Sequence, residues 1–428
     1  METSEIIKRI CDETDKNREK IIDIGRYIYK NPEMGFCEKK ASEAVRKVFD
    51  ELGIKYTYPC ALTGVKGQIG EKKHGINVCI IGEMDALKCS EHPDADSENR
   101  VHACGHNAQI AAMLGAAYGL KNIIKELDGN VIFMALPAEE FIDLEYRKKL
   151  KNDGRIEYMS GKQQLIAEGA FDDIDMAIML HAQPDEPKSK LYMQGYNLGF
   201  SAGTITFRGK AAHGSTPYDG VNALNTAALA ILGIHSNRET FKDEDRIRIH
   251  PIITKGGDVV NVVPDEVIME MYVRGASFEA IEKGKNAVAR SVKGACEMIG
   301  ATAEIEYLPG YFPLMESREL SNVMECAAER IIGKENIVKG KEITGSTDMG
   351  NLSALIPVIQ PSIGGFSGKL HSGEFKISVE ETAYVTAAKI LACTAAMLLT
   401  NGAEKAKKIK KQFEPMMTKE EYFKYINS

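Results

Sequence analysis

The sequence predicts an α/β protein in which a smaller α+β module is inserted into a domain built on an open mixed sheet flanked by helices. Apolar runs typical of buried strands alternate with stretches of helical periodicity, and this pattern changes between residues 197 and 311. A chain of 428 residues also exceeds what one hydrophobic core usually serves. We therefore expect one domain formed by residues 1–196 and 312–428, and a second formed by residues 197–311.

The N-terminal part of the larger domain is predicted to be helical. Residues 3–29 carry isoleucines at helical spacing, the motif Asn-Pro-Glu-Met-Gly-Phe at 31–36 interrupts them, and residues 39–52 resume the pattern. A buried helix is expected after the motif His-Ala-Cys-Gly-His-Asn at 102–107, because the ten residues that follow are almost all apolar.

Three apolar runs, at residues 76–81, 130–136 and 174–180, are typical of strands buried on both faces. Each run is followed by side chains able to bind metals or protons, namely Glu83 and Asp85, then Glu139 and Glu140, then His181. In an open α/β sheet the functional crevice lies beyond the carboxyl ends of the strands. The sequence therefore predicts a functional site at that edge.

The inserted module has a different order of elements. Its expected strands and helices follow as strand, helix, two strands, helix and strand, at residues 202–209, 222–235, 247–254, 265–274, 277–299 and 302–308. This order resembles a split βαβ, or ferredoxin-like, module.

After residue 311 the first pattern resumes, with a helix to Ile332, an apolar run at 354–359, a glycine-rich loop carrying His371 and a closing helix over 379–399. The segment between residues 141 and 163 is instead rich in charge. We interpret it as an inserted surface helix or lid whose charged side chains are solvated.

The composition argues against several kinds of partner and location. A net charge of −7 argues against nucleic acid, and no run of about 18 apolar residues is expected to span a membrane. The N-terminus lacks a basic segment followed by an apolar one, and nine cysteines without regular spacing fit reduced thiols. We expect a cytoplasmic protein.

The densest group of potential metal ligands is the 102–107 motif, where a cysteine thiolate beside imidazoles suits zinc and related ions. Taken alone, the motif is equally compatible with a buried cysteine and two histidines at a helix start. The polar groups at strand ends and in loops suffice for two metal ions and one further carboxylate: Asp85, Cys104, His106, Glu139, Glu140, His181 and His371. Adjacent glutamates can divide the work, one as a ligand and one as the base for an attacking water.

Seven motifs occur in order across nearly the whole chain: Asn-Pro-Glu-Met-Gly-Phe, Met-Asp-Ala-Leu, His-Ala-Cys-Gly-His-Asn, Pro-Ala-Glu-Glu, Leu-His-Ala, Gly-Lys-Ala-Ala-His-Gly-Ser and Leu-His-Ser. Together they resemble the zinc-dependent aminoacylase and carboxypeptidase family, most closely its aminobenzoyl-glutamate hydrolase and indole-acetyl-amino-acid hydrolase members. The resemblance implies an amidohydrolase that cleaves N-acyl amino acids, aminobenzoyl-glutamate-like compounds or dipeptides.

The resemblance also implies roles for individual residues. Two divalent ions per subunit, zinc or manganese, would be bound by Cys104, His106, Glu140, His181 and His371. Cys104 would bridge the two ions, Glu139 would be the general base, and Asp85 would orient a ligand from outside the coordination shell.

For the inserted module the resemblance implies a homodimer. His213 would reach the active site of the other subunit and stabilise an oxyanion, while Asn261 and Arg274 would hold the free carboxylate of a small amide or dipeptide substrate. The residues alone also fit structural roles, with Asn261 in a turn and Arg274 on a solvated strand face.

Some positions depart from the family pattern. Asn107 stands where many relatives have Asp, Glu83 stands where others have Asp or a metal-binding His, and the insertion after Glu140 is not general. Two alternatives therefore remain open. One is a metal-independent thiol hydrolase with Cys104 as nucleophile and His106 as base, and the other is a catalytically silent metal- or ligand-binding protein.

Overall fold

The computed structural model describes the whole chain except residues 1–2, 74, 185–189, 194–196, 341–344 and 428. The chain divides into two compact units. Unit 1 comprises Met1–Gly195, Met315–Glu342 and Asn351–Met416, and unit 2 comprises Tyr196–Leu314, Ile343–Gly350 and Met417–Ser428. Unit 2 thus includes two late segments that we had placed in the larger domain. The last one belongs there because the Phe312 ring packs against Tyr422 and Tyr425, with centroids 5.3 and 5.4 Å away.

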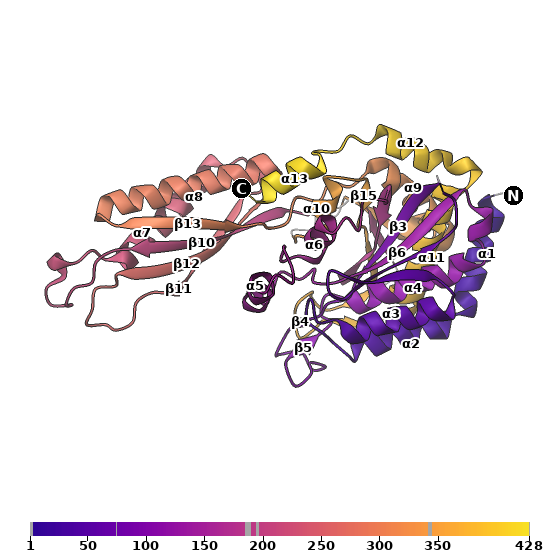
Figure 1. Cartoon of the computed structure of the whole chain (residues 1–428), viewed down its shortest axis with the longest axis horizontal. Helices are drawn as coiled ribbons and strands as arrows, with labels where there is room; N and C mark the ends of the chain where they lie inside the picture. The colour runs from indigo at the N-terminus through magenta and orange to yellow at the C-terminus, as the bar shows by residue number, and fades with distance from the viewer. Residues whose placement is uncertain (1–2, 74, 185–189, 194–196, 341–344, 428) are drawn as a thin grey trace. The chain divides into compact units, whose positions relative to one another are not determined.

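Unit 1 is built on a six-stranded mixed sheet in the order β1-β2-β6-β3-β7-β15 (Figure 1). The strands are β1 Lys55–Cys60, β2 Gly64–Ile69, β3 Ile76–Glu83, β6 Gly129–Leu136, β7 Met176–Ile178 and β15 Val358–Ile359. Strands β6, β3, β7 and β15 run parallel, and β1 and β2 pair antiparallel at one side. The carboxyl ends of β3 and β6 therefore lie at the same edge, as the sequence predicts.

Helices cover this sheet. They are α1 Thr3–Lys16, α2 Arg18–Tyr29, α3 Lys39–Glu51, α4 His106–Lys121, α5 Leu144–Asn152, α6 Gly161–Ala167, α9 Arg318–Ile332, α10 Met349–Ser353, α11 Ala387–Leu399 and α12 Glu404–Gln412. Helix α4 is buried from His106 to Leu120 and packs against α1, α2 and α11. The helix expected over residues 3–29 is two helices, because the Asn17 side chain binds the Glu13 carbonyl and ends the first.

One helical stretch, Glu381–Leu399, is long and apolar enough to cross a membrane by length and composition, contrary to the expectation that none would be. It begins as a π-helix over Glu381–Thr386 and continues as α11. Because 89% of its apolar window is buried inside the structure, it serves here as a core helix.

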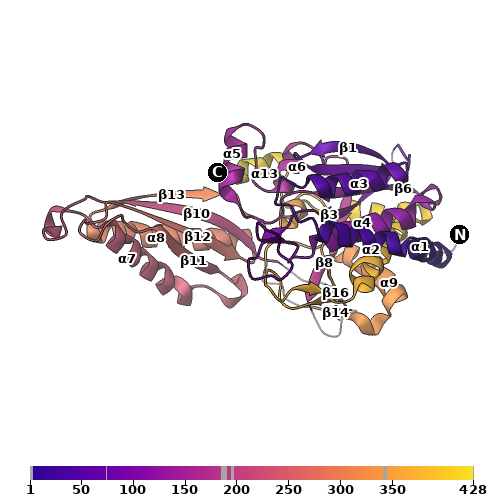
Figure 2. The ribbon, with the colours of Figure 1, turned by 90° about the horizontal axis from the view of Figure 1, so that it is seen from below.

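A second, smaller sheet in unit 1 was not expected from the sequence. It contains β8 His181–Pro184, β9 Leu191–Met193, β14 Ile337–Lys339, β16 Ser362–Ser367 and β17 Lys376–Ile377 (Figure 2). A two-stranded hairpin, β4 Leu87–Lys88 and β5 Arg100–Val101, lies ahead of α4. The small sheet matters for function because His181 begins β8, and the loop with His371 connects β16 to β17.

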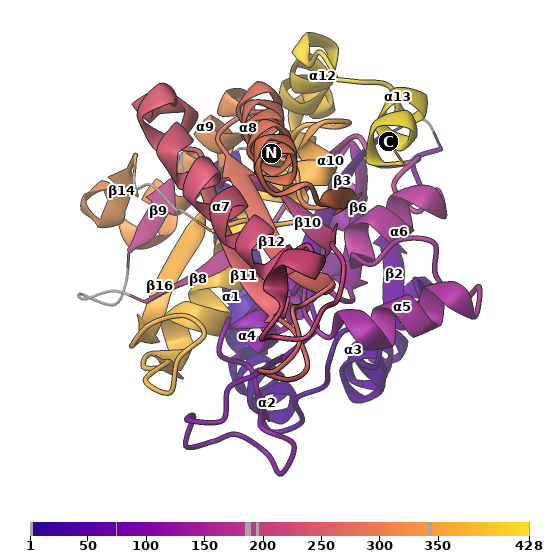
Figure 3. The ribbon, with the colours of Figure 1, turned by 90° about the vertical axis from the view of Figure 1, so that its left-hand side faces the viewer.

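Unit 2 has the topology expected for a ferredoxin-like module. Its strands β10 Gly199–Arg208, β11 Arg248–Lys255, β12 Glu266–Gly275 and β13 Thr302–Leu308 form an antiparallel sheet in the order β11-β12-β10-β13. Helices α7 Ala223–Ser236 and α8 Phe278–Ile299 pack on it around one apolar core (Figure 3). The unit also contains the late helix α13 Lys419–Ile426. The predicted fold class is confirmed.

Candidate metal centre

Two clusters of potential ligands share one cysteine. Cys104, His106 and His181 form the first, with the Cys104 Sγ 3.4 Å from Nε2 of His181. Cys104, Glu140 and His371 form the second, with Glu140 Oε1 3.0 Å from Nε2 of His371. Within each cluster the ligand atoms lie within 4.8 Å of one another. All five predicted ligands thus come together in unit 1, with the shared thiolate placed to bridge two ions.

The turn that opens α4 brings Cys104 and His106 to the same place. Gly105 has φ +81°, and a Cβ added there would lie only 2.6 Å from the Cβ of Ala182. Glycine both adopts this conformation without strain and allows the turn to approach the strand that begins with His181.

The orientation of His106 fits metal binding. Its Nδ1 lies 2.9 Å from the Asp85 carbonyl oxygen and 3.1 Å from Oδ1 of the same residue. Its buried Nε2 makes no hydrogen bond within the described part of the chain, and it lies 3.3 Å from Oε2 of Glu83 and 3.9 Å from Oε2 of Glu139. A buried imidazole nitrogen without a hydrogen bond is costly, and a metal ion would satisfy it. The residues therefore fit the group that they were predicted to hold.

Asp85 connects the two clusters. One of its carboxylate oxygens faces His106, and the other accepts a 2.8 Å hydrogen bond from the Glu140 backbone N–H. Burial raises the pKa of Asp85, but the hydrogen bond and charge of His106 outweigh that effect and lower this pKa to about 2. Asp85 therefore remains ionised and orients His106.

The surroundings of Cys104 favour its thiolate form. Burial raises the pKa of Cys104, but the neighbouring His181 and His106 outweigh it and hold that pKa well below its usual value. A thiolate is the form required of a metal ligand and equally of a nucleophile, so the choice between these roles depends on the surrounding ligands.

The two adjacent glutamates face different groups. Both are largely buried, at 7% exposure for Glu139 and 8% for Glu140. Glu140 belongs to the second ligand cluster, whereas Oε2 of Glu139 lies 3.9 Å from Nε2 of His106, in a third group of potential ligands that Glu83, His106 and Glu139 form. Glu139 is thus next to a ligand of the first cluster but belongs to neither cluster that contains Cys104.

Lys162, which sequence reasoning missed, lies against this centre. It is fully buried in α6, and its Nζ is 2.5 Å from Oε1 of Glu83, whose Oε2 accepts a 2.9 Å hydrogen bond from Gln109. The start of α6 approaches the sheet closely, since a Cβ on Gly161 would lie 1.7 Å from the Pro137 carbonyl oxygen. The sequence does not indicate that Lys162 is buried, because it lies among polar residues at the start of a short helix.

The predicted substrate residues lie in unit 2. The Asn261 amide nitrogen is 3.1 Å from Nε2 of His213, and both residues are exposed. Arg274 is half-buried, and its guanidinium carbon lies 5.4 and 5.5 Å from the ring centroids of Phe200 and Tyr272, which stack on each other. The roles of these three residues in catalysis and binding remain predictions.

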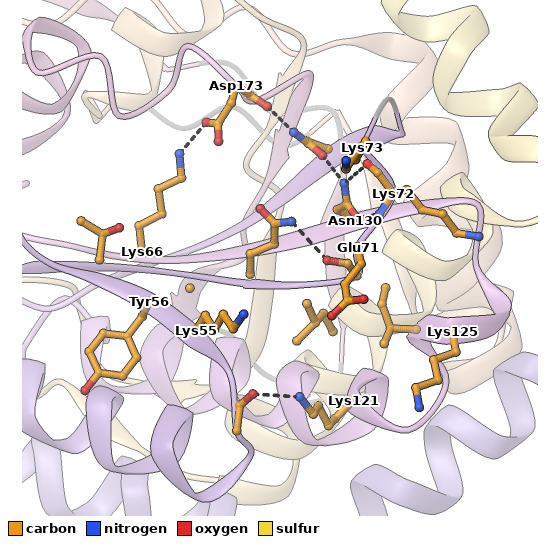
Figure 4. Close-up of a pocket in the computed structure, with 18 residues that line it drawn as sticks. Lys55, Tyr56, Lys66, Glu71, Lys72, Lys73, Lys121, Lys125, Asn130 and Asp173 are labelled. Carbon is orange, nitrogen blue, oxygen red and sulfur yellow. Dashed lines mark hydrogen bonds and ion pairs between the residues drawn. The ribbon is translucent and has the colours of Figure 1, made fainter.

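A cavity of about 1170 Å³ lies elsewhere in unit 1 and includes Asn77 and Asn130, at the amino ends of β3 and β6 (Figure 4). Six lysines line it: Lys55, Lys66, Lys72, Lys73, Lys121 and Lys125. Because β3 and β6 are parallel and carry Glu83 and Glu139 toward their carboxyl ends, this cavity is at the opposite edge of the sheet from the metal centre.

An open α/β sheet that brings together two ligand clusters sharing one cysteine, with a further glutamate beside His106, is the arrangement expected of a metal-dependent hydrolase. The chain belongs to peptidase family M20/M25/M40, whose model matches residues 79–397. The predicted family, enzyme class and metal-dependent amidohydrolase function are thereby confirmed.

Individual relatives are similar over most of their length. An Arabidopsis thaliana IAA-amino acid hydrolase, ILR1-like 2, is 25% identical over 349 residues, 79% of this chain and 75% of the relative. A dinuclear metal-binding peptidase of Bacillus subtilis shares the fold with TM-score 0.72 and 24% identity, over 90% of this chain and 99% of its own. An aminobenzoyl-glutamate utilization protein of Klebsiella pneumoniae aligns with TM-score 0.66 and 18% identity, over 91% and 99%.

Proposed function

We propose that this enzyme binds two zinc or manganese ions and hydrolyses N-acyl amino acids, aminobenzoyl-glutamate-like compounds or dipeptides that carry a free carboxylate. The observation that carries the proposal is the sharing of Cys104 between two ligand clusters, with Glu139 outside both and 3.9 Å from His106 of the first. The IAA-amino acid hydrolase and the aminobenzoyl-glutamate utilization protein support this substrate range by their names.

The protein's own residues supply the proton transfers. Divalent ions bound at the two clusters would acidify water and polarise the scissile carbonyl. Glu139 takes the proton of the attacking water and later gives it to the leaving amine. Asp85 holds His106 in one tautomer and orientation, while its second oxygen fixes the backbone at Glu140.

For the substrate carboxylate we propose Arg274 and Asn261. The guanidinium of Arg274 lies beside the stacked rings of Phe200 and Tyr272, and one of its nitrogens donates a 2.7 Å hydrogen bond to the Ser346 hydroxyl. Since a guanidinium carries five donors in a planar fork, others are available for a carboxylate.

A homodimer through unit 2 is also part of the proposal. Strand β11 is an edge strand of its sheet, and apolar side chains are exposed on it and on the loop that follows: Ile252, Ile253, Val259 and Val260. An exposed apolar sheet edge favours pairing with another chain. His213 would then act in the partner's site.

The nine cysteines are all free thiols, which supports a cytoplasmic location.

Metal analysis combined with a substrate panel tests the function. The purified protein should contain about two ions per chain and cleave N-acyl amino acids, aminobenzoyl-glutamate or dipeptides in a chelator-sensitive manner. Turnover without metal that is abolished by alkylation would instead establish the thiol hydrolase. Bound metal without cleavage of any member of the panel would establish the silent binding protein.

A further inference from the structure

The charged segment after Glu140 contains a cation that is buried rather than solvated. Arg147 in α5 is 1% exposed, whereas its neighbours Lys148 and Lys149 are exposed. Within the described residues, the hydrogen-bond acceptors of Arg147 are all backbone carbonyls. Its charge helps to lower the pKa of Asp85, but burying a guanidinium that hydrogen-bonds only to carbonyls is unfavourable, so its position requires a compensating role.

The carbonyls that Arg147 contacts belong to the turn carrying the two glutamates. Its Nη1 donates to the carbonyl oxygens of Met159 at 2.7 Å and Ala138 at 3.4 Å, and its Nη2 donates to that of Glu140. Ala138 has φ +55°, a conformation that non-glycine residues adopt only when the surroundings hold it.

Two buried carboxyl groups bind the N–H groups of the same turn. The Ala138 N–H donates to Glu38 at 2.9 Å, and the Glu140 N–H donates to Asp85 at 2.8 Å. Arg147 donates to the carbonyls of the same two residues, which also accept from the backbone N–H groups of Gly161 and Ile142. Arg147 is thus the side chain that joins both carbonyls flanking Glu139 to one rigid group.

The Asn-Pro-Glu-Met-Gly-Phe motif, which supplies no metal ligand, provides space for this guanidinium. A Cβ on Gly35 would lie 2.5 Å from Nη2 of Arg147 and 2.9 Å from the Cα of Ala138. The guanidinium carbon of Arg147 lies 5.5 Å from the ring centroid of Phe36. A motif near the N-terminus and a helix inserted after Glu140 thus meet at one side chain.

We propose that Arg147 is a positioning residue that fixes the Glu139–Glu140 turn, so that Glu139 faces the attacking water and Glu140 faces the metal. The inserted helix α5 is then part of the catalytic scaffold. This inference rests on the proposed function for its kinetic readout. It can also be tested without turnover, because displacing Glu140 alters the coordination of a bound metal whether or not substrate is cleaved.

The test uses two variants of Arg147. Arg147→Met keeps the aliphatic part of the side chain and loses the hydrogen-bond donors, and Arg147→Lys keeps the charge and loses the planar guanidinium. The control is Lys149→Met, on the exposed face of the same helix. We expect both Arg147 variants to lower kcat by about tenfold to hundredfold. The absorption spectrum of the cobalt-substituted protein and the pH profile of kcat/KM should also change, and Lys149→Met should match the wild type in all three measurements.

A role confined to stability would lower the melting temperature while the folded Arg147 variants kept the wild-type cobalt spectrum and pH profile, and that result would overturn the proposal. If Arg147→Met fails to fold, Arg147→Lys and the rescue of Arg147→Ala by added guanidinium carry the test. Restoration of kcat and of the spectrum supports positioning, and restoration of neither in folded protein contradicts it. Should the wild type cleave nothing in the panel, the proposed function fails while the cobalt spectra still decide the role of Arg147.

Discussion

Lys162 and Glu83 form an ion pair of 2.5 Å in which both side chains are fully buried beside the metal centre. Burial raises the pKa of Glu83, but the charges of Lys162, His106 and His181 together outweigh it and lower that pKa. The ion pair thus helps to keep a carboxylate ionised beside His106. Within unit 1, the inserted segment and α6 contribute two buried cations to the surroundings of the metal centre, Arg147 and Lys162.

Removing one member of this pair leaves an uncompensated charge in the core. We expect Lys162→Met to lower the free energy of unfolding by about 3 to 5 kcal/mol. The double variant Lys162→Met/Glu83→Gln should recover most of that loss, because neither side chain is then charged. Urea unfolding at pH 7 measures both. Additive losses in the double variant would show that the two residues are not coupled.

The Glu139–Glu140 pair should separate under mutation. Glu139→Gln is expected to retain both metal ions and to lower kcat by roughly 100- to 10,000-fold, the range of general base catalysis. Glu140→Gln should instead lower metal occupancy, since Glu140 belongs to the second ligand cluster. Metal analysis beside kinetics distinguishes the two. Equal metal loss in both variants, or near-normal turnover by Glu139→Gln, would contradict the assignment.

Glu38 should make stability depend on pH. It is fully buried, and burial, with the nearby charge of Asp85, raises its pKa to about 8. Because the folded state then holds this proton more tightly than the unfolded state, Glu38 stabilises the fold below about pH 4. That contribution is lost as the pH rises toward and through 8.

The variant Glu38→Gln, which remains neutral, isolates this effect. Its melting temperature minus that of the wild type should increase from pH 5 to about pH 8 and level off above it, because over that range the wild type loses a proton on unfolding. Thermal unfolding followed by circular dichroism at several pH values provides the measurement. A difference that stays constant with pH would mean that Glu38 is already ionised at pH 5.

The candidate ligands could be grouped from the sequence because several of them follow strands that are recognisable on their own. The runs that correspond to β3 and β6 are almost wholly apolar, and parallel pairing places their carboxyl ends together. The small sheet was missed because its strands are only two to six residues long. His181 and His371 were nevertheless identified, through motifs rather than through that sheet.

The burial of two charged side chains was also not predicted from the sequence. Arg147 and Lys162 lie in stretches whose polar composition predicts exposure to solvent. The burial of Lys162 depends on Glu83, which is far away in the sequence. The burial of Arg147 depends on the carbonyls of a turn in which Ala138 has a positive φ. Arg274 was named as a candidate, but its aromatic neighbours were not predicted, for a related reason. Its partner Phe200 lies directly opposite on β10, a cross-strand pair that exists only once the register of β10 and β12 is known.

If His213 acts across a dimer, activity should be restored by mixing two inactive proteins. We expect His213→Ala and Glu139→Ala to be nearly inactive alone, and a hybrid dimer to contain one site with both groups intact. Mixed and separately purified dimers can be compared by kcat per chain. Hybrids that form but remain inactive would show that His213 acts within its own subunit or supports the structure through its contact with Asn261.

Arg274 is expected to select substrates that carry a free carboxylate. Its guanidinium is fixed by Phe200 and Tyr272 and by Ser346, so a carboxylate would meet a preorganised fork. For carboxylate substrates, Arg274→Ala should lower kcat/KM by the equivalent of about 2 to 3 kcal/mol, the scale of a charge-assisted hydrogen bond. The corresponding carboxamides should be cleaved by wild type and variant at similar rates. Equal losses on acids and carboxamides would show that Arg274 supports the structure of unit 2 and that the carboxylate is bound by other residues.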